Sequence, residues 1–426
     1  MKSEWQRLPV QDVCSLVTSG GTPSRTQPEF YIGGSWSWIK TQELKDTWID
    51  KTEEHITSEA IVKSAAKILP EKTILMAMYG ATVGQLGILR SPMTCNQACC
   101  AMVVDEDKAD PFFLFYQLLL RRKQFQNLAT GAAQQNLNTQ TIKKFVLDFP
   151  PIPEQKAIAR ILGSLDDKIE LNRRMNATLE QMAQTLFRAW FVDFEPVKAK
   201  AAGLQPVGMD AETAALFPSE WESSTRLIPK GWEVGNLSDV CEARRETVQP
   251  SSVNSDSEYV GLEHIPQNSI ALNNWGRAEQ VDSTKSRFQQ GDILFGKLRP
   301  YFHKVVVAPV NGICSTDILV LQAINRRDFG FVLCHVSSPE LIDYATRLSN
   351  GARMPRVGWK DIAAYSVVIP PPAIQETFTR TLIGMISKIN VNVFESQTLA
   401  QLRDALLPRL VSGALRVPEA MLTENL

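Results

Sequence analysis

The sequence predicts an α+β protein in which two globular domains form a pseudo-two-fold repeat and are separated by two long antiparallel coiled-coil helices. Three observations lead to this prediction. The 426-residue chain has an ordinary globular composition, with 44% hydrophobic and 21% charged residues. Its second half repeats landmarks of its first half at a nearly constant separation. Each half ends in a long stretch whose apolar residues recur every seven positions.

The repeat is clearest in the later part of each half, where matched residues lie 220 positions apart. These matches are Gly131 with Gly351, Pro150 with Pro370, Gln155 with Gln375, Ile169 with Ile389, Asn172 with Asn392, and Leu179 with Leu399. The starts of the two halves match at a separation of 227, because Trp5 and Cys14 correspond to Trp232 and Cys241. Two related halves in one chain favour a pseudo-two-fold arrangement.

The chain divides in order into six predicted segments. These are a globular domain at 1–150, a helix at 151–197, a linker at 198–228, a globular domain at 229–370, a helix at 371–417 and a tail at 418–426. The Ala and Gly content of the linker predicts a mobile surface stretch, pinned to the fold near Phe217.

Each globular domain is predicted to be α+β from short apolar runs that are typical of strands, each set followed by a helical stretch. The first domain has strand-like runs at 73–78 and 101–104 and a helical stretch at 111–125. The second domain has strand-like runs at 292–295, 304–308 and 318–321 and a helical stretch at 329–344.

The two long helices are predicted from one shared heptad position. It is occupied by Ile158, Leu165, Asn172, Leu179 and Leu186 in the first helix, and by Phe378, Met385, Asn392, Leu399 and Leu406 in the second. Helices this long need a partner for their apolar stripe, and each copy is the obvious partner of the other. Antiparallel pairing brings Asn172 and Asn392 together, where a buried polar residue fixes the register. Two unrelated amphipathic helices in separate domains remain the alternative.

Composition excludes several classes of protein. The net charge of −1 is not that of a protein that binds nucleic acid alone, so basic residues must be local or a partner must supply phosphate contacts. Seven cysteines without CxxC spacing and four scattered histidines argue against disulfides and metal sites. No apolar run approaches the ~20 residues that span a bilayer, and the polar N-terminus is no signal peptide, so we expect a cytoplasmic protein.

Catalytic motifs are not apparent in the sequence. The stretch Gly291–Lys297 has P-loop spacing, but Leu298 stands where Ser or Thr would hold magnesium and the stretch resembles a strand. Neither the usual amino-methyltransferase tetrad nor a GxSxG elbow is present. We therefore expect no catalysis by this chain itself and no cofactor bound to it.

Candidate DNA contacts in the first domain lie in two loops. The first comprises Tyr79, Gly80, Ala81 and Thr82, where glycine permits close backbone approach to DNA. The second contains Gln134, Gln135 and Asn136, whose amides suit the adenine edge. A tight hairpin turn and an Asn-capped helix start are the structural alternatives. Lys40, Thr41 and Gln42 are further candidates in this domain.

Candidate contacts in the second domain are more basic. Lys297, Arg299, Tyr301 and Lys304 form a basic stretch with interleaved aromatics, and His264 is a further candidate. Arg353 and Arg356 occupy the place of Gln134–Asn136 by the repeat alignment, and arginine is the usual reader of guanine. Solvated loops are the alternative for each residue alone.

The helical segments resemble a known family. The first carries Gly131, Asn136–Leu137, Pro150–Gln155, Ile161–Leu162, Leu165–Asp166 and Met182–Phe194, which are similar to the central conserved region of type I restriction-modification specificity subunits. The second conserved region is resembled by Pro371–Pro372, Gln375–Glu376, Ile389 and Leu406–Gly413. The resemblance is specific in these segments and weak within the two domains.

This resemblance implies two target-recognition domains, each reading one half of an interrupted double-stranded DNA target. The helices would set the spacer and dock two methyltransferase subunits, and restriction/translocase subunits would complete the assembly. S-adenosylmethionine, ATP and Mg²⁺ are then expected on those partners. Lys297–Tyr301 stands where the first domain has Gly80–Gly84, so the halves should read different sequences and the target need not be palindromic. A specificity subunit of another phage-defence methyltransferase system and a scaffold that does not bind DNA are the alternatives.

Overall fold

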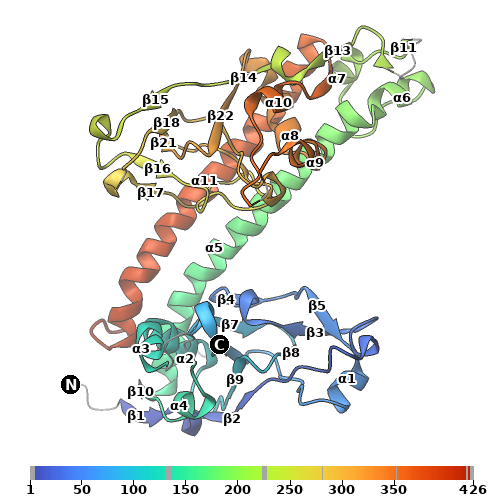
Figure 1. Cartoon of the computed structure of the whole chain (residues 1–426). Helices are drawn as coiled ribbons and strands as arrows, with labels where there is room; N and C mark the ends of the chain where they lie inside the picture. The colour runs from blue at the N-terminus through green and yellow to red at the C-terminus, as the bar shows by residue number, and fades with distance from the viewer. Residues whose placement is uncertain are drawn as a thin grey trace. The chain divides into compact units, whose positions relative to one another are not determined.

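The computed structural model describes residues 5–129, 136–222, 228–280, 282–351, 353–418 and 421–422. It divides into two compact units, one of residues 1–169 with 398–426 and the other of residues 170–397 (Figure 1). Each unit contains one of the predicted globular domains together with parts of both long helices. The two units are described separately below.

The first unit is built on a five-stranded sheet with the order β2-β9-β6-β7-β4. Its strands are β2 (Cys14–Ser19), β9 (Cys99–Val104), β6 (Ile74–Ala77), β7 (Leu86–Leu89) and β4 (Thr47–Ile49). All neighbours are antiparallel except β4 and β7. The predicted strands at 73–78 and 101–104 are confirmed as β6 and β9, and β6 is buried along its whole length.

Smaller elements complete this unit. A three-stranded sheet has the order β5 (Glu54–Ile56), β3 (Trp36–Ile39) and β8 (Thr94–Cys95), and β1 (Gln6–Pro9) pairs with β10 (Val146–Phe149). The helices are α1 (Ser58–Val62), α2 (Pro111–Leu120), α3 (Arg122–Leu128) and α4 (Thr139–Lys143).

The second unit contains two larger sheets. One has the order β14 (Cys241–Ala243), β22 (Ile318–Ala323), β19 (Ile293–Gly296) and β20 (Val305–Val307). The other has the order β15 (Thr247–Val248), β18 (Lys285–Phe288), β21 (Gly312–Cys314), β16 (Glu258–Val260) and β17 (Gly276–Arg277). β13 (Glu233–Asn236) pairs with β23 (Ser366–Ile369), as β1 pairs with β10. The P-loop-like stretch contains β19, as its resemblance to a strand predicted.

Both helices predicted within the globular domains are interrupted. The stretch at 111–125 is split into α2 and α3 at Arg121, and the stretch at 329–344 into α8 (Phe329–Val336) and α9 (Pro339–Leu348). The second break has a local cause, since Ser338 caps α9 by accepting the N–H of Leu341 and Pro339 cannot continue α8. A short helix, α10 (Trp359–Ala363), corresponds to α4.

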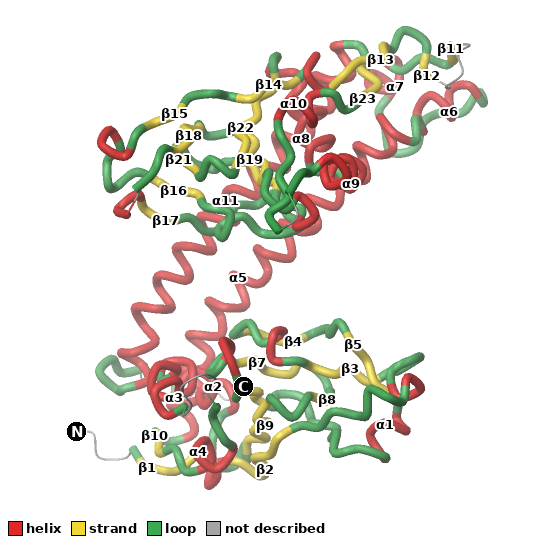
Figure 2. The backbone as a smooth tube through the Cα atoms, viewed as in Figure 1, coloured by secondary structure: helices red, strands yellow, loops and turns green. Residues whose placement is uncertain are grey.

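The two long helices are α5 (Ile152–Phe187), with 36 residues, and α11 (Pro372–Val411), with 40 residues (Figure 2). The second turn of each helix lies in the core of its domain, because Ile158 and Phe378 are both fully buried. The helical turn Arg188–Val192 extends α5 with five π-helical residues. Among the described residues, no helix is long and apolar enough to cross a membrane.

The segment that follows α5 is packed onto the second unit, where composition predicted a mobile stretch. It contains α6 (Glu195–Ala201) and α7 (Ala211–Leu216) before the short pair β11 (Trp221–Glu222) and β12 (Ile228–Pro229). Phe217 is fully buried against Trp190, with their rings 5.1 Å apart. The predicted pinning of this stretch near Phe217 is confirmed.

Candidate nucleic-acid interface

The first candidate site is the loop that follows β6 in the first unit. Tyr79 and Asn136 form an isolated antiparallel bridge. The N–H of Leu137 donates to the Met78 carbonyl at 2.8 Å, and the N–H of Met78 donates to the Ala98 carbonyl at 2.9 Å. The structure therefore brings the predicted loop at Tyr79–Thr82 together with Asn136. Gln134 and Gln135 lie outside the described residues.

The second unit has an equivalent loop after β19. Leu298 and Arg356 form the corresponding antiparallel bridge. The N–H of Val357 donates to the Lys297 carbonyl at 3.1 Å, and the N–H of Lys297 donates to the Asp317 carbonyl at 3.0 Å. Asn136 and Arg356 thus occupy the same place in two equivalent backbone frames, as the repeat alignment predicted.

Backbone angles support this equivalence. Gly80 and Gly84 have φ values of 68° and 81°, and Arg299 and His303 have φ values of 52° and 50° at the corresponding positions. A 3₁₀ turn lies between each pair, at Gly80–Thr82 and at Pro300–Phe302. A left-handed residue other than glycine costs about 1–2 kcal/mol, so the second loop holds strain that the first avoids.

Contacts with the segment at 353–356 hold Arg299 in this conformation. Its N–H donates to the Pro355 carbonyl at 2.7 Å, and its Nη2 donates to the Arg353 carbonyl at 3.3 Å. Arg353 is exposed, and Tyr301 is 51% exposed beside the ring of Phe302. The structure thus gathers five predicted contacts, namely Lys297, Arg299, Tyr301, Arg353 and Arg356.

Among the residues that the structure describes, Asp317 is the carboxylate that pairs with this basic cluster, and the sequence did not point to it. Its Oδ1 lies 3.0 Å from Nε of Arg356. The signal available in the sequence was the repeat alignment, which sets Asp317 opposite Ala98. No rule of spacing distinguishes such an aspartate from a solvated one.

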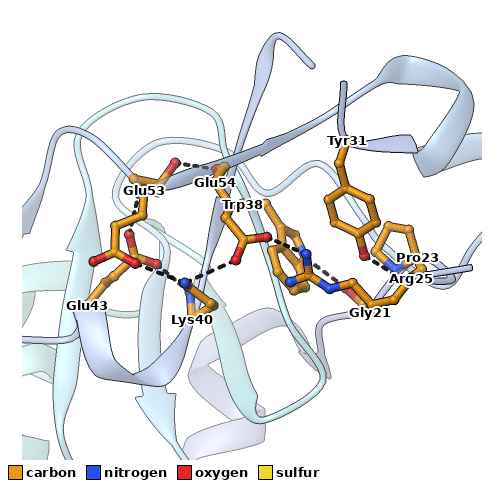
Figure 3. A network of polar contacts seen from close by, with 10 residues as sticks. Gly21, Pro23, Arg25, Tyr31, Trp38, Lys40, Glu43, Glu53 and Glu54 are labelled. Atoms are coloured by element: carbon orange, nitrogen blue, oxygen red, sulfur yellow. Dashed lines mark hydrogen bonds and ion pairs between the residues drawn. The ribbon is translucent and has the colours of Figure 1, made fainter. Parts of the chain in front are cut away.

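Lys40 belongs to a different environment in the first unit. Its ammonium lies 2.9 Å from Glu53 and 3.1 Å from Glu54, and these bonds raise the pKa of Lys40 (Figure 3). Arg25 also pairs with Glu54 at 2.7 Å and stacks on Tyr31 and Trp38. Lys40, Thr41 and Gln42 remain predicted contacts, but the charge of Lys40 is balanced within the fold.

His264 and Lys304 form hydrogen bonds with one loop of the second unit. Nδ1 of His264 accepts the N–H of Gly261 at 2.9 Å, and the ammonium of Lys304 donates to the Leu262 carbonyl. The His264 ring also meets the Tyr259 ring edge-on at 6.0 Å. Both side chains therefore have structural roles here, and their contacts with DNA stay predictions.

The predicted register residues lie in a buried polar cluster of the second unit. Asn172 donates to Glu395 at 2.9 Å and to Ser396 at 3.3 Å, while Asn392 donates to Asn176 at 2.8 Å. Asn172 and Asn392 are fully buried. Asn176 and Ser396 are themselves 220 positions apart, so the two contacts are repeat-related.

All seven cysteines are buried and free. Burial raises the pKa of Cys14, Cys241 and Cys314 to about 12, so these thiols stay protonated at neutral pH. The described residues contain no cluster of side chains that could hold a metal ion.

Comparison with known proteins identifies the family to which this fold belongs. A family model described as "Type I restriction modification DNA specificity domain" matches residues 2–181 and 229–393. The chain therefore belongs to the family of type I restriction-modification specificity subunits, which determine DNA sequence specificity and are not catalytic.

Individual relatives agree with this assignment. The type I restriction enzyme MjaIX specificity subunit of Methanocaldococcus jannaschii is 26% identical over 98% of this chain and 94% of its own length. The HindI specificity subunit of Haemophilus influenzae is 27% identical over 71% of this chain and 77% of its own length. The crystal structure of the type I S subunit from M. genitalium covers 95% of this chain and 96% of that chain, with a TM-score of 0.57 and 15% identity, and so shares the fold.

Proposed function

We propose that this chain directs a type I restriction-modification complex to an interrupted, non-palindromic sequence in double-stranded DNA. Each of the two domains, at 1–150 and 229–370, reads one half of the target. The proposal is carried by the pair of equivalent loops, which share a backbone frame but present different side chains. Asn136 and Arg356 stand at one such place, and Gly80 and Arg299 at another.

The spacer is an antiparallel coiled coil of α5 and α11. At 1.5 Å per residue, helices of 36 and 40 residues extend about 54–60 Å. The hydrogen bonds of Asn172 to Ser396 and of Asn392 to Asn176 support the antiparallel register, because rising numbers in α5 meet falling numbers in α11. Asn172 and Asn392 fix this register.

The catalytic work belongs to partner subunits. Two methyltransferase subunits with S-adenosylmethionine dock on the helices, and ATP-dependent restriction/translocase subunits with Mg²⁺ join them in the cytoplasm. The net charge of −1 supports this arrangement, since a chain that supplies only local basic residues relies on partners for phosphate contacts.

The test is a methylation map of host DNA with and without the gene for this chain. We expect one two-part adenine motif to lose its methylation when the gene is removed. Restoring the gene should restore the motif, which controls for effects on neighbouring genes. An unchanged map in cells whose methyltransferase subunit is active would contradict the proposal and favour a scaffold role.

A further inference from the structure

The two loop sites differ at two adjoining positions within one shared backbone frame. Where the first unit has Asn136 and Ala98, the second has Arg356 and Asp317. The bridge and the two backbone hydrogen bonds that define the frame are the same in both units, so the main difference at these two positions lies in the side chains. A frame that stays constant while its side chains change is suited to reading different bases.

Asp317 occupies one defined edge of the Arg356 guanidinium. Nε lies 3.0 Å from Oδ1, and Nη2 lies 3.5 Å from Oδ2. Arginine has five N–H donors in a planar fork, so the opposite edge, formed by Nη1 and the second hydrogen of Nη2, is left free. In the described part of the chain, Nη1 of Arg356 donates to no protein group.

Backbone hydrogen bonds to neighbouring residues fix the positions of both Arg356 and Asp317. The N–H and carbonyl of Arg356 bond Asn350 at 2.9 Å each, and the N–H of Asp317 donates to Oγ of Ser315 at 3.2 Å. Arg356 keeps 48% of its side chain exposed and Asp317 keeps 29%. The free edge of the guanidinium is therefore oriented before any ligand arrives, which reduces the ordering cost of binding.

The free edge matches one base. Guanine presents two acceptors, N7 and O6, in the major groove, and two parallel N–H donors of arginine can bond both. Adenine presents a donor beside N7, so it cannot satisfy the same edge. At the equivalent place, Asn136 is exposed and its neighbour Ala98 has no charge. An amide offers one donor and one acceptor, as the adenine edge requires.

We infer that Asp317 is a positioning residue that orients Arg356 toward a guanine in one half-site, while Asn136 reads an adenine in the other half-site. This inference rests on the proposed function and adds to it the identity of one base in each half of the DNA target. Asp317 does not contact the base but acts through Arg356.

The test maps the methylated motif produced by the complete complex with Asp317→Asn or Asp317→Glu. With Asp317→Asn we expect discrimination against the other bases at one guanine position to fall about 5-fold or more, because a bidentate contact loses its orientation. The second half-site should stay unchanged, which shows that the complex still folds and assembles. Asp317→Glu, which keeps the carboxylate, should restore most of the discrimination.

Glu258→Gln is the matched control. It breaks the ion pair of Glu258 with Arg277 in the same unit, which has a similar length of 2.8 Å and similar exposures of 24% and 56%. We expect its motif to equal the wild-type motif. If Asp317→Asn keeps wild-type discrimination at the guanine position, the inference about Asp317 is wrong but the proposed function still stands. If the wild-type chain directs no two-part motif at all, the proposed function fails instead.

Discussion

Buried His335 shows how one residue can make stability depend on pH. It packs edge-on between Phe187 and Phe331 at ring distances of 4.7 and 4.4 Å, and its Nε2 has no partner in the described structure. Burial lowers the pKa of His335 from 6.5 to about 3. Between pH 6.5 and about 3, His335 is therefore protonated in the unfolded chain but neutral in the folded chain.

We predict that His335→Leu makes the protein less sensitive to acid. The wild type should lose stability as the pH falls from about 6.5 toward 3, and the variant should lose less over that window. Thermal melting at a series of pH values measures this difference. His55→Leu, at an exposed site in the first unit, is the control and should keep the wild-type profile. Parallel profiles for wild type and His335→Leu would contradict the assignment.

A second prediction at the residue scale concerns the basic loop. Lys297→Met with Arg299→Gly installs the residues found at the equivalent positions 78 and 80 of the first unit, so the frame should tolerate them. We expect DNA binding by the complete complex to weaken and the slope of log K against log salt to fall by about one to two, because two of the predicted cationic contacts with DNA are removed. Binding titrations at several salt concentrations provide the measurement.

Lys230→Met is the control for this double variant. It removes an exposed lysine of the same unit that pairs with Glu220 at 2.6 Å, outside the loop. Its salt slope should match that of the wild type. An undiminished affinity in the double variant would favour the scaffold reading over DNA recognition.

At the scale of elements, the polar cluster between α5 and α11 makes a prediction about stability. Asn392→Ala removes the donor that bonds Oδ1 of Asn176 at 2.8 Å and leaves a buried acceptor unpaired. We expect the free energy of unfolding to fall by about 1–3 kcal/mol, as measured by denaturant titration. Val391→Ala, at a neighbouring site that is 57% exposed, should change it by less than about 0.5 kcal/mol. Equal effects of the two substitutions would argue against a stabilising cluster.

The sequence was most informative about elements that repeat. The heptad position predicted α5 and α11, and the alignment of the halves predicted that Arg356 stands in the place of Asn136. It missed Asn176 and Ser396, which lie four residues beyond the heptad position and complete the cluster of Asn172 and Asn392. A polar residue one helical turn away is ordinarily on a solvated face, so only packing reveals it.

Contacts that depend on strand register could not be predicted from the sequence either. Lys40 was a reasonable DNA contact as an isolated basic residue, but the pairing of Trp38 with Glu54 places two carboxylates beside its ammonium. The same applies to Asp317, whose pairing with Arg356 depends on the bridge between Leu298 and Arg356. Sequence separation of 39 residues in that pair leaves no local signal.

At the scale of the whole molecule, the proposed spacer can be lengthened. We predict that inserting one heptad between Ile169 and Glu170, and one between Gln397 and Thr398, lengthens the unread spacer of the target by about three base pairs. Seven residues add about 10.5 Å of helix, and each base pair adds about 3.4 Å. Both half-sites should keep their sequences, because the loops of each domain are unchanged. Methylation should be weaker than in the wild type, because three base pairs turn the second half-site by about 100° about the DNA axis while one heptad turns the helices by only about 20°.

Mapping the methylated motif measures the spacer directly. Insertion in one helix alone is the control, because it offsets α5 against α11 between the Asp166–Arg403 ion pair and the polar cluster and should abolish methylation. A motif with an unchanged spacer after the double insertion would refute the ruler role of the helices.

The two equivalent loops lie on one polypeptide, and this has a consequence for the information that the complex can use. A symmetric dimer carries the same recognition domain twice, so the number of possible targets equals the number of domain variants. Two domains that vary independently give a number of possible targets equal to the product of their variants. Unequal halves also give the target a direction along the DNA. A complex bound to such a site therefore has a defined orientation on the DNA, whereas a complex bound to a palindrome does not.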